Sequence, residues 1–268
     1  MNIALWVGFI CAALLLRWAV IASGLASAFS DYHGVVMVLG GMGAAMFINC
    51  NFSQLGGALG SFVRLFLPAR LPSVDDCIAE VVRLSRMAQR EGGILALQGE
   101  ARDFADGFLH RAIVVAISAG ESGETRRIME TEMKQLRIAR QEDANVFRTM
   151  GVLAPMFGLL GTLLGMVNLL ETMSDPTKAA TAMALALSSA FFGIGIANFI
   201  CVPVSGQIRL AGIRETMILE LLLEGALDIA SGKAPYLVEL HLASYSKARR
   251  QLLETGAETA AAAPQPTP

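Results

Sequence analysis

Charged residues are scarce in this chain, and the scarcity is concentrated in a few long stretches. Of the 268 residues, 16% are Asp, Glu, Lys or Arg, whereas soluble domains carry about 25%. Four stretches contain no carboxylate at all: 3–23, 34–50, 150–170 and 180–204. A helix of this length can cross a hydrocarbon layer roughly 30 Å thick. We therefore expect an all-α membrane protein with four transmembrane helices, and a helical cytoplasmic domain formed by the segment between the second and third helices and the C-terminal tail.

Clustered cysteines and histidines are missing as well. The four cysteines and three histidines stand at spacings that fit neither a metal site nor a redox site. The sequence offers no Ser/His/Asp or Cys/His constellation, and the fragment GLLGTLLG lacks the Lys-Ser/Thr of a phosphate-binding loop. We therefore expect no enzyme, no cofactor and no metal. A net charge of −2 does not point to a nucleic-acid partner.

Basic residues are distributed unevenly around the apolar stretches. The segment 51–149 holds 13 of the 21 Lys and Arg residues, and the tail after residue 205 holds six. The connectors 24–33 and 171–179 hold only Lys178 between them. Because loops rich in Lys and Arg stay in the cytoplasm, we expect a multi-pass membrane protein with both termini, the segment 51–149 and the tail in the cytoplasm. The first stretch lacks a basic start and a convincing cleavage site, so it is expected to be retained rather than removed as a signal peptide.

The segment 51–149 has the periodicity of helices. Ser73 begins an amphipathic helix with acidic residues in its first turn, and a Gly-Gly pair ends it. A second helix is expected from about Ile94 to His110, followed by an apolar helix too short to span a membrane. From Glu124 a long polar helix is expected to continue directly into the third membrane stretch.

The tail is expected to be helical too. A new helix should begin near Ser205, after the fourth stretch, and stop at Gly232. The Ala/Pro-rich end of the chain should be disordered. The expected divisions are two transmembrane helices (1–50), a cytoplasmic helical domain (51–149), two further transmembrane helices (150–205), C-terminal cytoplasmic helices (206–254, the last over about 236–254) and a disordered tail (255–268).

Small residues line one face of each of the last two membrane stretches. In the third stretch they recur at helical spacing, at Gly158, Gly161, Thr162 and Gly165. In the fourth stretch the matching positions are Ala186, Ser189, Ala190, Gly193 and Ala197. Such faces let helix backbones approach closely in lipid, and they also leave room for a helix from another chain. The pattern leaves both interpretations open.

Two prolines and a few hydroxyls are the remaining features of these stretches. Pro155 lies one turn into the third stretch and Pro203 near the end of the fourth, where a missing backbone hydrogen bond can kink the helix. Proton or sodium relay across a membrane usually requires an acidic side chain. Because these stretches have none, a conducting protein would need a partner chain to supply the acid.

Four motifs in this order resemble the MotA/PomA family of flagellar stator subunits, within the wider group that includes TolQ and ExbB. They are VVMVLGGMGAAMFINCNFSQL, APMFGLLGTLLG, MSDPTKAATAMALALSSAFFGIGIAN and LELLLEGALDIASGKAPYLVELHL. The resemblance extends over about residues 1–245. The last motif favours the stator branch, because TolQ and ExbB lack this tail.

The resemblance implies an assembly and a function. Five copies would surround two copies of a MotB-like partner, whose helix carries the acid that binds the transported H⁺ or Na⁺. Ion flow would turn the ring, and its cytoplasmic helices would push on the rotor protein FliG. The alternative is a TolQ/ExbB-like energiser of outer-membrane processes. A non-conducting membrane scaffold is a further alternative.

The resemblance also implies roles for residues in the membrane stretches. Thr162, Ser189 and Ala190 would stand beside the ion pathway, although family members usually place a further Thr at the position of Ala190. Pro155 and Pro203 match two prolines linked to conformational coupling. The small residues expected to face the pore are Gly158, Gly161, Gly165, Ala186, Gly193 and Ala197.

A separate pair of residues would contact the rotor. Arg90 matches a basic family residue used in electrostatic contact with FliG. The acidic family position falls on Gln98 here, and Glu100 is the nearest acid. For Arg90 and Glu100 the plain alternative is a solvated helix end.

Overall fold

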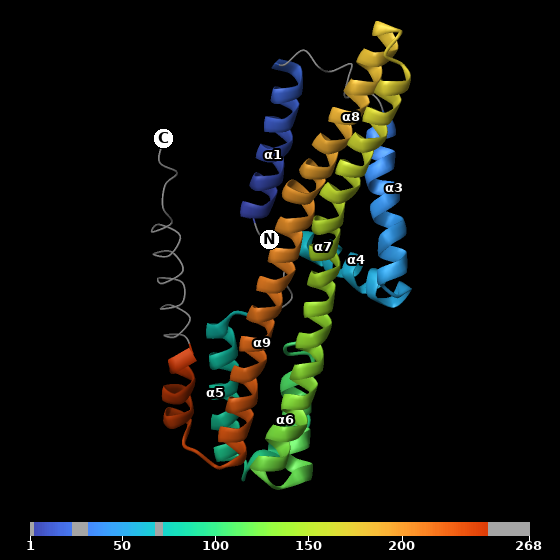
Figure 1. The fold of residues 1–268 in the computed structure, drawn as a ribbon. Coiled ribbons are helices and arrows are strands. Elements are labelled where there is room, and N and C mark those ends of the chain that lie inside the picture. Colours follow the sequence, from blue (N-terminus) through green and yellow to red (C-terminus); the bar gives the residue numbers. More distant parts are fainter. Residues whose placement is uncertain (1–2, 23–31, 68–71, 246–268) are drawn as a thin grey trace. The chain divides into compact units, whose positions relative to one another are not determined.

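The chain is mainly helical in the part that the computed structural model describes, residues 3–22, 32–67 and 72–245 (Figure 1), and this part contains no strand. The predicted all-α fold is confirmed. The helices are α1 (Ile3–Ala22), α3 (Tyr32–Asn49), α4 (Phe52–Phe66), α5 (Val74–Arg90), η1 (Ile94–Leu97), α6 (Phe108–Ala119), α7 (Ser122–Glu171), α8 (Pro176–Ile196), η2 (Ala197–Cys201), α9 (Val202–Ala230) and a last helix over 235–245. The predicted disordered tail and the end of the predicted helix 236–254 lie outside the described residues.

Contacts divide the chain into two compact units. We call residues 1–69 and 138–212 the apolar unit, and residues 70–137 and 213–268 the polar unit. Helices α7 and α9 each contribute residues to both units.

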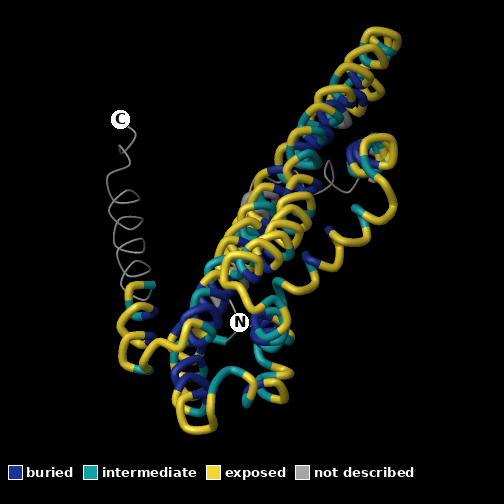
Figure 2. The backbone as a smooth tube through the Cα atoms, turned by 90° about the horizontal axis from the view of Figure 1, so that it is seen from below, coloured by how far each residue is buried: buried dark blue, intermediate teal, exposed yellow. Residues whose placement is uncertain are grey.

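The apolar unit is built on close contacts between α3, α7 and α8. Its core includes Val38 and Met42 of α3 and Ala154 of α7, each no more than 4% exposed. Helix α4 is held to α7 by the hydroxyl of Ser61, which donates a hydrogen bond of 2.5 Å to the carboxylate of Asp143. Figure 2 shows buried and exposed residues alternating along these helices, as expected where only one face of a helix is covered.

Two long helical runs contain apolar windows of membrane-spanning length. They are α7 and the run from Pro176 to Ala230, and only 22% and 35% of their windows are buried within the chain. The core helix of a soluble protein would be mostly covered, so this exposure fits helices that face lipid. A shorter apolar segment, Gly34–Asn49, lies in α3. That the chain has four transmembrane helices stays a prediction.

The polar unit has its own core, formed by α5, α6 and the adjoining parts of α7 and α9. Leu84, Phe108 and Leu221 are each no more than 1% exposed. The short apolar helix predicted before the long polar one is α6, and it packs into this core. Burial raises the pKa of the Cys77 thiol to about 12, so this thiol stays protonated.

Helix α5 begins where the sequence predicts. The Ser73 hydroxyl accepts a hydrogen bond from the backbone N–H of Asp76 at 3.1 Å, and the Asp76 carboxylate accepts one from the backbone N–H of Ser73 at 3.1 Å. This reciprocal pair is a capping box. The hydrogen bond from the Ser73 hydroxyl, followed by that from its backbone N–H, lowers the pKa of the Asp76 carboxyl.

The last helix is anchored by a buried carboxylate. Asp228 of α9 is 3% exposed. Its two oxygens lie 2.6 Å from Lys233 Nζ and 2.6 Å from His241 Nδ1. The two contacts hold the residues after the Gly232 turn against α9, because an unpaired carboxylate at this depth would be costly.

Two predicted helices are wrong. The segment from Ile94 to His110 is not one helix. It begins with the single 3₁₀ turn η1, and the residues after it include left-handed backbone at Ala101, Ala105 and Asp106, which a continuous α-helix cannot contain. The helix expected to begin near Ser205 does not begin there either, because α8 continues through η2 into α9 without a break.

The second membrane stretch, 34–50, lies in α3, which ends at Asn49 and is followed by a separate helix, α4. The Asn51 and Gln54 side chains form the capping box of α4. Two other predictions are confirmed. Helix α7 runs from the polar segment directly into the third stretch, and α9 ends at Ala230, just before the predicted stop at Gly232.

The packing of α5 on α9 gives a test of the polar unit. A Cβ on Gly225 would lie 2.6 Å from Val81 Cγ1, and a valine side chain cannot swing aside. Gly225→Ala should therefore lower stability by about 1–3 kcal/mol, measured as a lower midpoint of thermal unfolding by circular dichroism. Gly206→Ala on the same helix meets open space, so it should leave the midpoint unchanged or raise it. Equal midpoints for both variants would contradict this packing.

Candidate functional site

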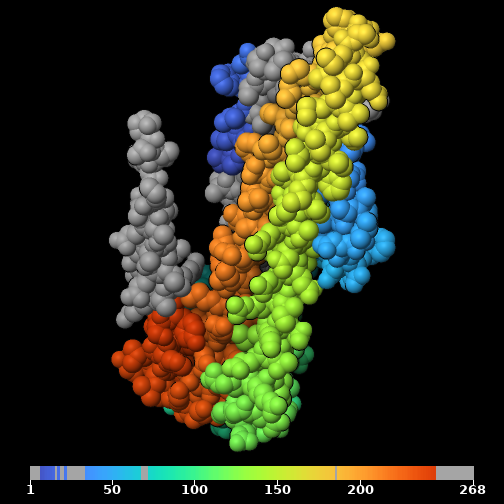
Figure 3. Space-filling view, viewed as in Figure 1, coloured from blue at the N-terminus to red at the C-terminus, as the bar shows by residue number. Residues whose placement is uncertain are grey.

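The candidate site is the contact between α7 and α8, where both helices present small residues. A Cβ on Gly158 would lie 2.9 Å from the Ser189 carbonyl oxygen, and one on Gly193 would lie 2.7 Å from the Ala154 carbonyl oxygen and 3.0 Å from Gly158 Cα. The two backbones therefore touch at this level. Figure 3 shows α7 and α8 side by side along this part of the apolar unit.

The contact continues along α7 in the direction of its C-terminus. A Cβ on Gly161 would lie 2.6 Å from Ser189 Cβ, and one on Gly165 would lie 2.6 Å from Ala186 Cβ. The structure thus brings together five of the six predicted small residues in one helix–helix contact. The sixth, Ala197, is 2% exposed at the start of η2 and packs in the apolar core.

These contacts favour the packing interpretation of the small faces, because each face is covered by the other helix of the same chain. The surface of α7 that is open to another chain or to lipid lies elsewhere on the helix. It carries large apolar side chains at helical spacing, among them Val152, Met156, Leu159, Leu163, Met166 and Leu170, which are 50–68% exposed.

The three residues predicted to stand beside an ion pathway occupy different surroundings. Ser189 is 2% exposed and lies between Gly161 of α7 and Gly34 of α3. Ala190 is half-buried, with its Cα against Gly158. Thr162 is half-buried at the edge of the contact, and its hydroxyl donates a hydrogen bond to the Leu159 carbonyl at 2.6 Å. Of the three, Thr162 is nearest to the open face of α7.

The two predicted prolines each remove a backbone hydrogen-bond donor from a long helical run. Pro155 is inside α7, and Pro203 is the second residue of α9, separated by one residue from the π-helical segment η2. Proline has no N–H to donate to the carbonyl four residues earlier, which for Pro155 is that of Gly151. A Cβ on Gly151 would lie 3.3 Å from Cys201 Cβ. The two interruptions therefore face each other across the helix pair. The sequence showed the prolines but gave no signal for the π-helical segment.

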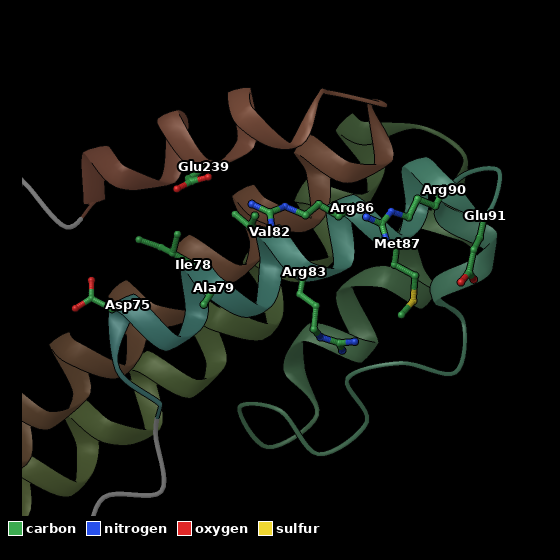
Figure 4. A pocket seen from close by; sticks show the side chains of 10 residues that line it. All are labelled: Asp75, Ile78, Ala79, Val82, Arg83, Arg86, Met87, Arg90, Glu91 and Glu239. Carbon is green, nitrogen blue, oxygen red and sulfur yellow. The ribbon is translucent and has the colours of Figure 1, made fainter.

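The predicted rotor-contact residues lie in the polar unit, and the structure places them in one neighbourhood. Arg90 lines a groove of about 750 Å³ between α5 and the last helix, together with Arg83, Arg86 and the apolar side chains of Ile78 and Val82 (Figure 4).

Glu100 is already engaged within the chain. Its carboxylate lies 3.0 Å from Arg83 Nη2, and Arg83 also pairs with Glu80 at 2.7 Å. The Arg83 guanidinium donates hydrogen bonds to the carboxylates of Glu80 and Glu100, and these bonds, first that to Glu80 and then that to Glu100, raise the pKa of Arg83. Among the described residues, Arg86 and Arg90 form no ion pair. Sequence reasoning missed Arg86, although its position four residues before Arg90 places it on the same side of α5.

The contact at Gly161 can be tested with a double-mutant cycle. Gly161→Ala places its methyl against the Ser189 side chain and should lower the free energy of unfolding by about 1–3 kcal/mol. The loss would be measured as a lower thermal-unfolding midpoint of the detergent-solubilised protein. Ser189→Gly removes both clashing atoms, Cβ and Oγ. The double variant should therefore be more stable than the sum of the two single effects predicts. Strict additivity would show that the two positions do not touch.

Comparisons with known proteins agree with this architecture. The sequence model of the MotA/TolQ/ExbB proton channel family matches residues 98–220. The uncharacterized protein YtxD of Bacillus subtilis is 30% identical over 90% of this chain and 89% of its own length. The chemotaxis protein PomA of Vibrio alginolyticus is 26% identical over 95% of this chain and 99% of its own.

A solved structure extends the likeness to the fold. The flagellar MotAB stator complex from Bacillus subtilis contains a chain that superposes with a TM-score of 0.84 at 24% identity, covering 92% of this chain and 97% of that one. The similarity therefore extends well beyond the segment that the family model matches, over helices of both units. On the sequence likeness to YtxD and the family match together, the chain belongs to the MotA/TolQ/ExbB proton channel family.

Proposed function

We propose that the chain is the A subunit of a rotary flagellar stator, which converts an ion motive force into torque together with a MotB-like partner. The observation that carries this proposal is the end-to-end likeness to proteins named for motility. One of them, motility protein A of Cereibacter sphaeroides, is 28% identical over 89% of this chain and 93% of its own length. A TolQ/ExbB-like energiser is not favoured, because the matched length includes the C-terminal tail that the resemblance assigns to the stator branch.

As a member of this family, the chain is an inner-membrane protein. We propose that α1, α3, the C-terminal part of α7 and α8 span the bilayer, with both termini in the cytoplasm. The distribution of Lys and Arg supports this orientation. The low burial of the apolar windows of α7 and α8 supports lipid or other chains as their surroundings.

The ion pathway requires an acid that this chain lacks in its apolar stretches. We propose that a MotB-like helix supplies it, and that five copies of the chain surround two such helices. Because the small faces of α7 and α8 are used on each other, the partner would contact the opposite faces. Thr162, at the edge of the α7–α8 contact, would lie nearest to the ion pathway. Ser189 and Ala190 would lie farther from the pathway, because they are covered by this contact. The transported ion is H⁺ or Na⁺.

The groove on α5 supports a second part of the proposal, contact with a rotor protein such as FliG. Arg86 and Arg90 offer guanidinium groups that form no ion pair with a described carboxylate. The groove that they line also holds apolar side chains and the carboxylates of Asp75, Glu91 and Glu239. Such a surface fits an acidic helix or loop with an apolar anchor. Because Glu100 is paired with Arg83, the contact would depend on Arg86 and Arg90 rather than on Glu100.

Deletion of the coding sequence tests the proposed function. We expect a strain without this chain to assemble flagella and lose swimming, and to regain swimming when the wild-type chain is restored. Detergent resistance and iron uptake should stay normal. Unimpaired swimming together with detergent sensitivity or poor iron uptake would favour the TolQ/ExbB alternative and overturn the stator.

Charge reversal in the groove tests the rotor contact. The double variant Arg86→Glu and Arg90→Glu should reduce swimming speed several-fold, because like charges would then face the acidic partner. The chain should still enter the membrane and co-purify with its partner. Arg102→Glu serves as the matched control, since Arg102 is exposed in the same unit but does not line the groove. Equal speeds for the double variant and the control would contradict this contact.

A further inference from the structure

An apolar groove in the apolar unit lies between α1 and the run α8–η2. It has a volume of about 630 Å³, within the range of about 300–1,000 Å³ that small-ligand sites occupy. One wall is formed by Phe9, Ala12 and Ala13 of α1, and the other by residues that include Phe191, Gly195 and Phe199. Small residues leave the space between the two walls, and the aromatic rings bound it.

One cationic side chain lines this apolar groove. Arg17 is the sole charged residue among the lining residues, and it forms no ion pair or hydrogen bond with any residue that the structure describes. An unpaired guanidinium within a membrane helix is costly, and such a residue either has an anionic partner or reaches toward the lipid headgroups. Arg17 lies five residues before the end of α1 at Ala22, roughly 7 Å along the helix axis. Its side chain can therefore reach the headgroup level.

A second copy of this chain is a poor occupant for the groove. Its apolar stretches contain no Asp or Glu, so a helix from another copy would cover Arg17 without neutralising it. A phospholipid meets both requirements. Its acyl chain matches the apolar walls, and its phosphate is an acceptor for the charge-assisted hydrogen bonds that a guanidinium forms best.

We propose that this groove binds one phospholipid, with an acyl chain between α1 and α8–η2 and the phosphate on Arg17. The lipid would complete the contact between α1 and the rest of the apolar unit, and would supply the anion that the chain lacks beside Arg17. The inference rests on the membrane location proposed above and not on stator activity.

A photoactivatable phosphatidylglycerol with a diazirine on its acyl chain tests the site. The full-length chain in complex with its partner is placed in phosphatidylcholine nanodiscs, labelled and digested, and the labelled peptides are identified by mass spectrometry. We expect labelling of peptides from 9–21 and 191–200. Unlabelled phosphatidylglycerol should compete, whereas diacylglycerol, which has no phosphate, should not.

Two variants separate the two parts of the site. Arg17→Gln removes the charge, and labelling should fall about ten-fold. Gly195→Leu fills the groove and leaves the charge, and labelling should fall as well. A Cβ at Gly195 meets nothing within 4 Å, so the new side chain has space to enter. Gly8→Leu on α1 and Arg64→Gln on α4 are matched controls outside the groove and should label as the wild type does.

Three results would overturn the proposal. They are unchanged labelling in both Arg17→Gln and Gly195→Leu, equal competition by diacylglycerol, or cross-linking from a photoreactive residue at position 195 to a second copy of the chain instead of lipid. Failure of the stator proposal would be seen in a different experiment, as normal swimming of a strain without this chain. That result would not change the lipid labelling expected of the purified complex.

Discussion

The apolar unit depends on the direct contact between the backbones of α7 and α8. Gly158 and Gly193 lie so close that a Cβ on either would reach the backbone of the opposite helix. In lipid the hydrophobic effect does not draw helices together, so the attraction must come from close packing, and packing this close requires residues with almost no side chain. The requirement explains why these helices, so rich in leucine and methionine elsewhere, carry glycine and alanine on one face. It also leaves their large apolar side chains on the outside, where another chain or lipid can cover them.

This contact determines which polar groups can serve an ion. The Ser189 hydroxyl is enclosed by Gly161 and Gly34, so it can shape the helix pair but cannot be reached first from outside. Thr162 stands at the edge, with its hydroxyl on the Leu159 carbonyl. A hydroxyl bonded in this way keeps its oxygen lone pairs available as an acceptor. The departure at Ala190, where the family usually has threonine, therefore concerns a position that packs against Gly158, and a larger side chain there would have to fit beside that contact.

The sequence was most informative where one local rule decides the structure. Ser73 and the acidic residues after it predicted the start of α5, where the structure has a capping box, and Gly232 predicted the end of α9. Both predictions rest on local effects of a few residues. The segment after Ile94 was misjudged because its apolar residues fit a helical period, and that period gives no sign of the left-handed backbone at Ala101 and Asp106. The small faces were recognised from their spacing, but spacing alone could not tell which helix would cover them. The groove at Arg17 depends on α1 lying beside α8, and no local pattern encodes that neighbour.

Six cations of this chain illustrate two different uses of a positive charge. Arg111, Arg126 and Lys233 each have a carboxylate at 2.6–2.7 Å within the polar unit, so these cations are used to hold its helices together. Among the described residues, Arg17, Arg86 and Arg90 have no such partner. Arg17 lines a groove with apolar walls, and Arg86 and Arg90 line a groove that mixes apolar and charged side chains. A cation beside an apolar surface is stable only if water or an external anion solvates it. In the orientation proposed above, a lipid phosphate is the anion available to Arg17, and a carboxylate of another protein is the anion available to Arg86 and Arg90. The same unpaired cation would then serve two different partners, because that orientation places the two units in different solvents.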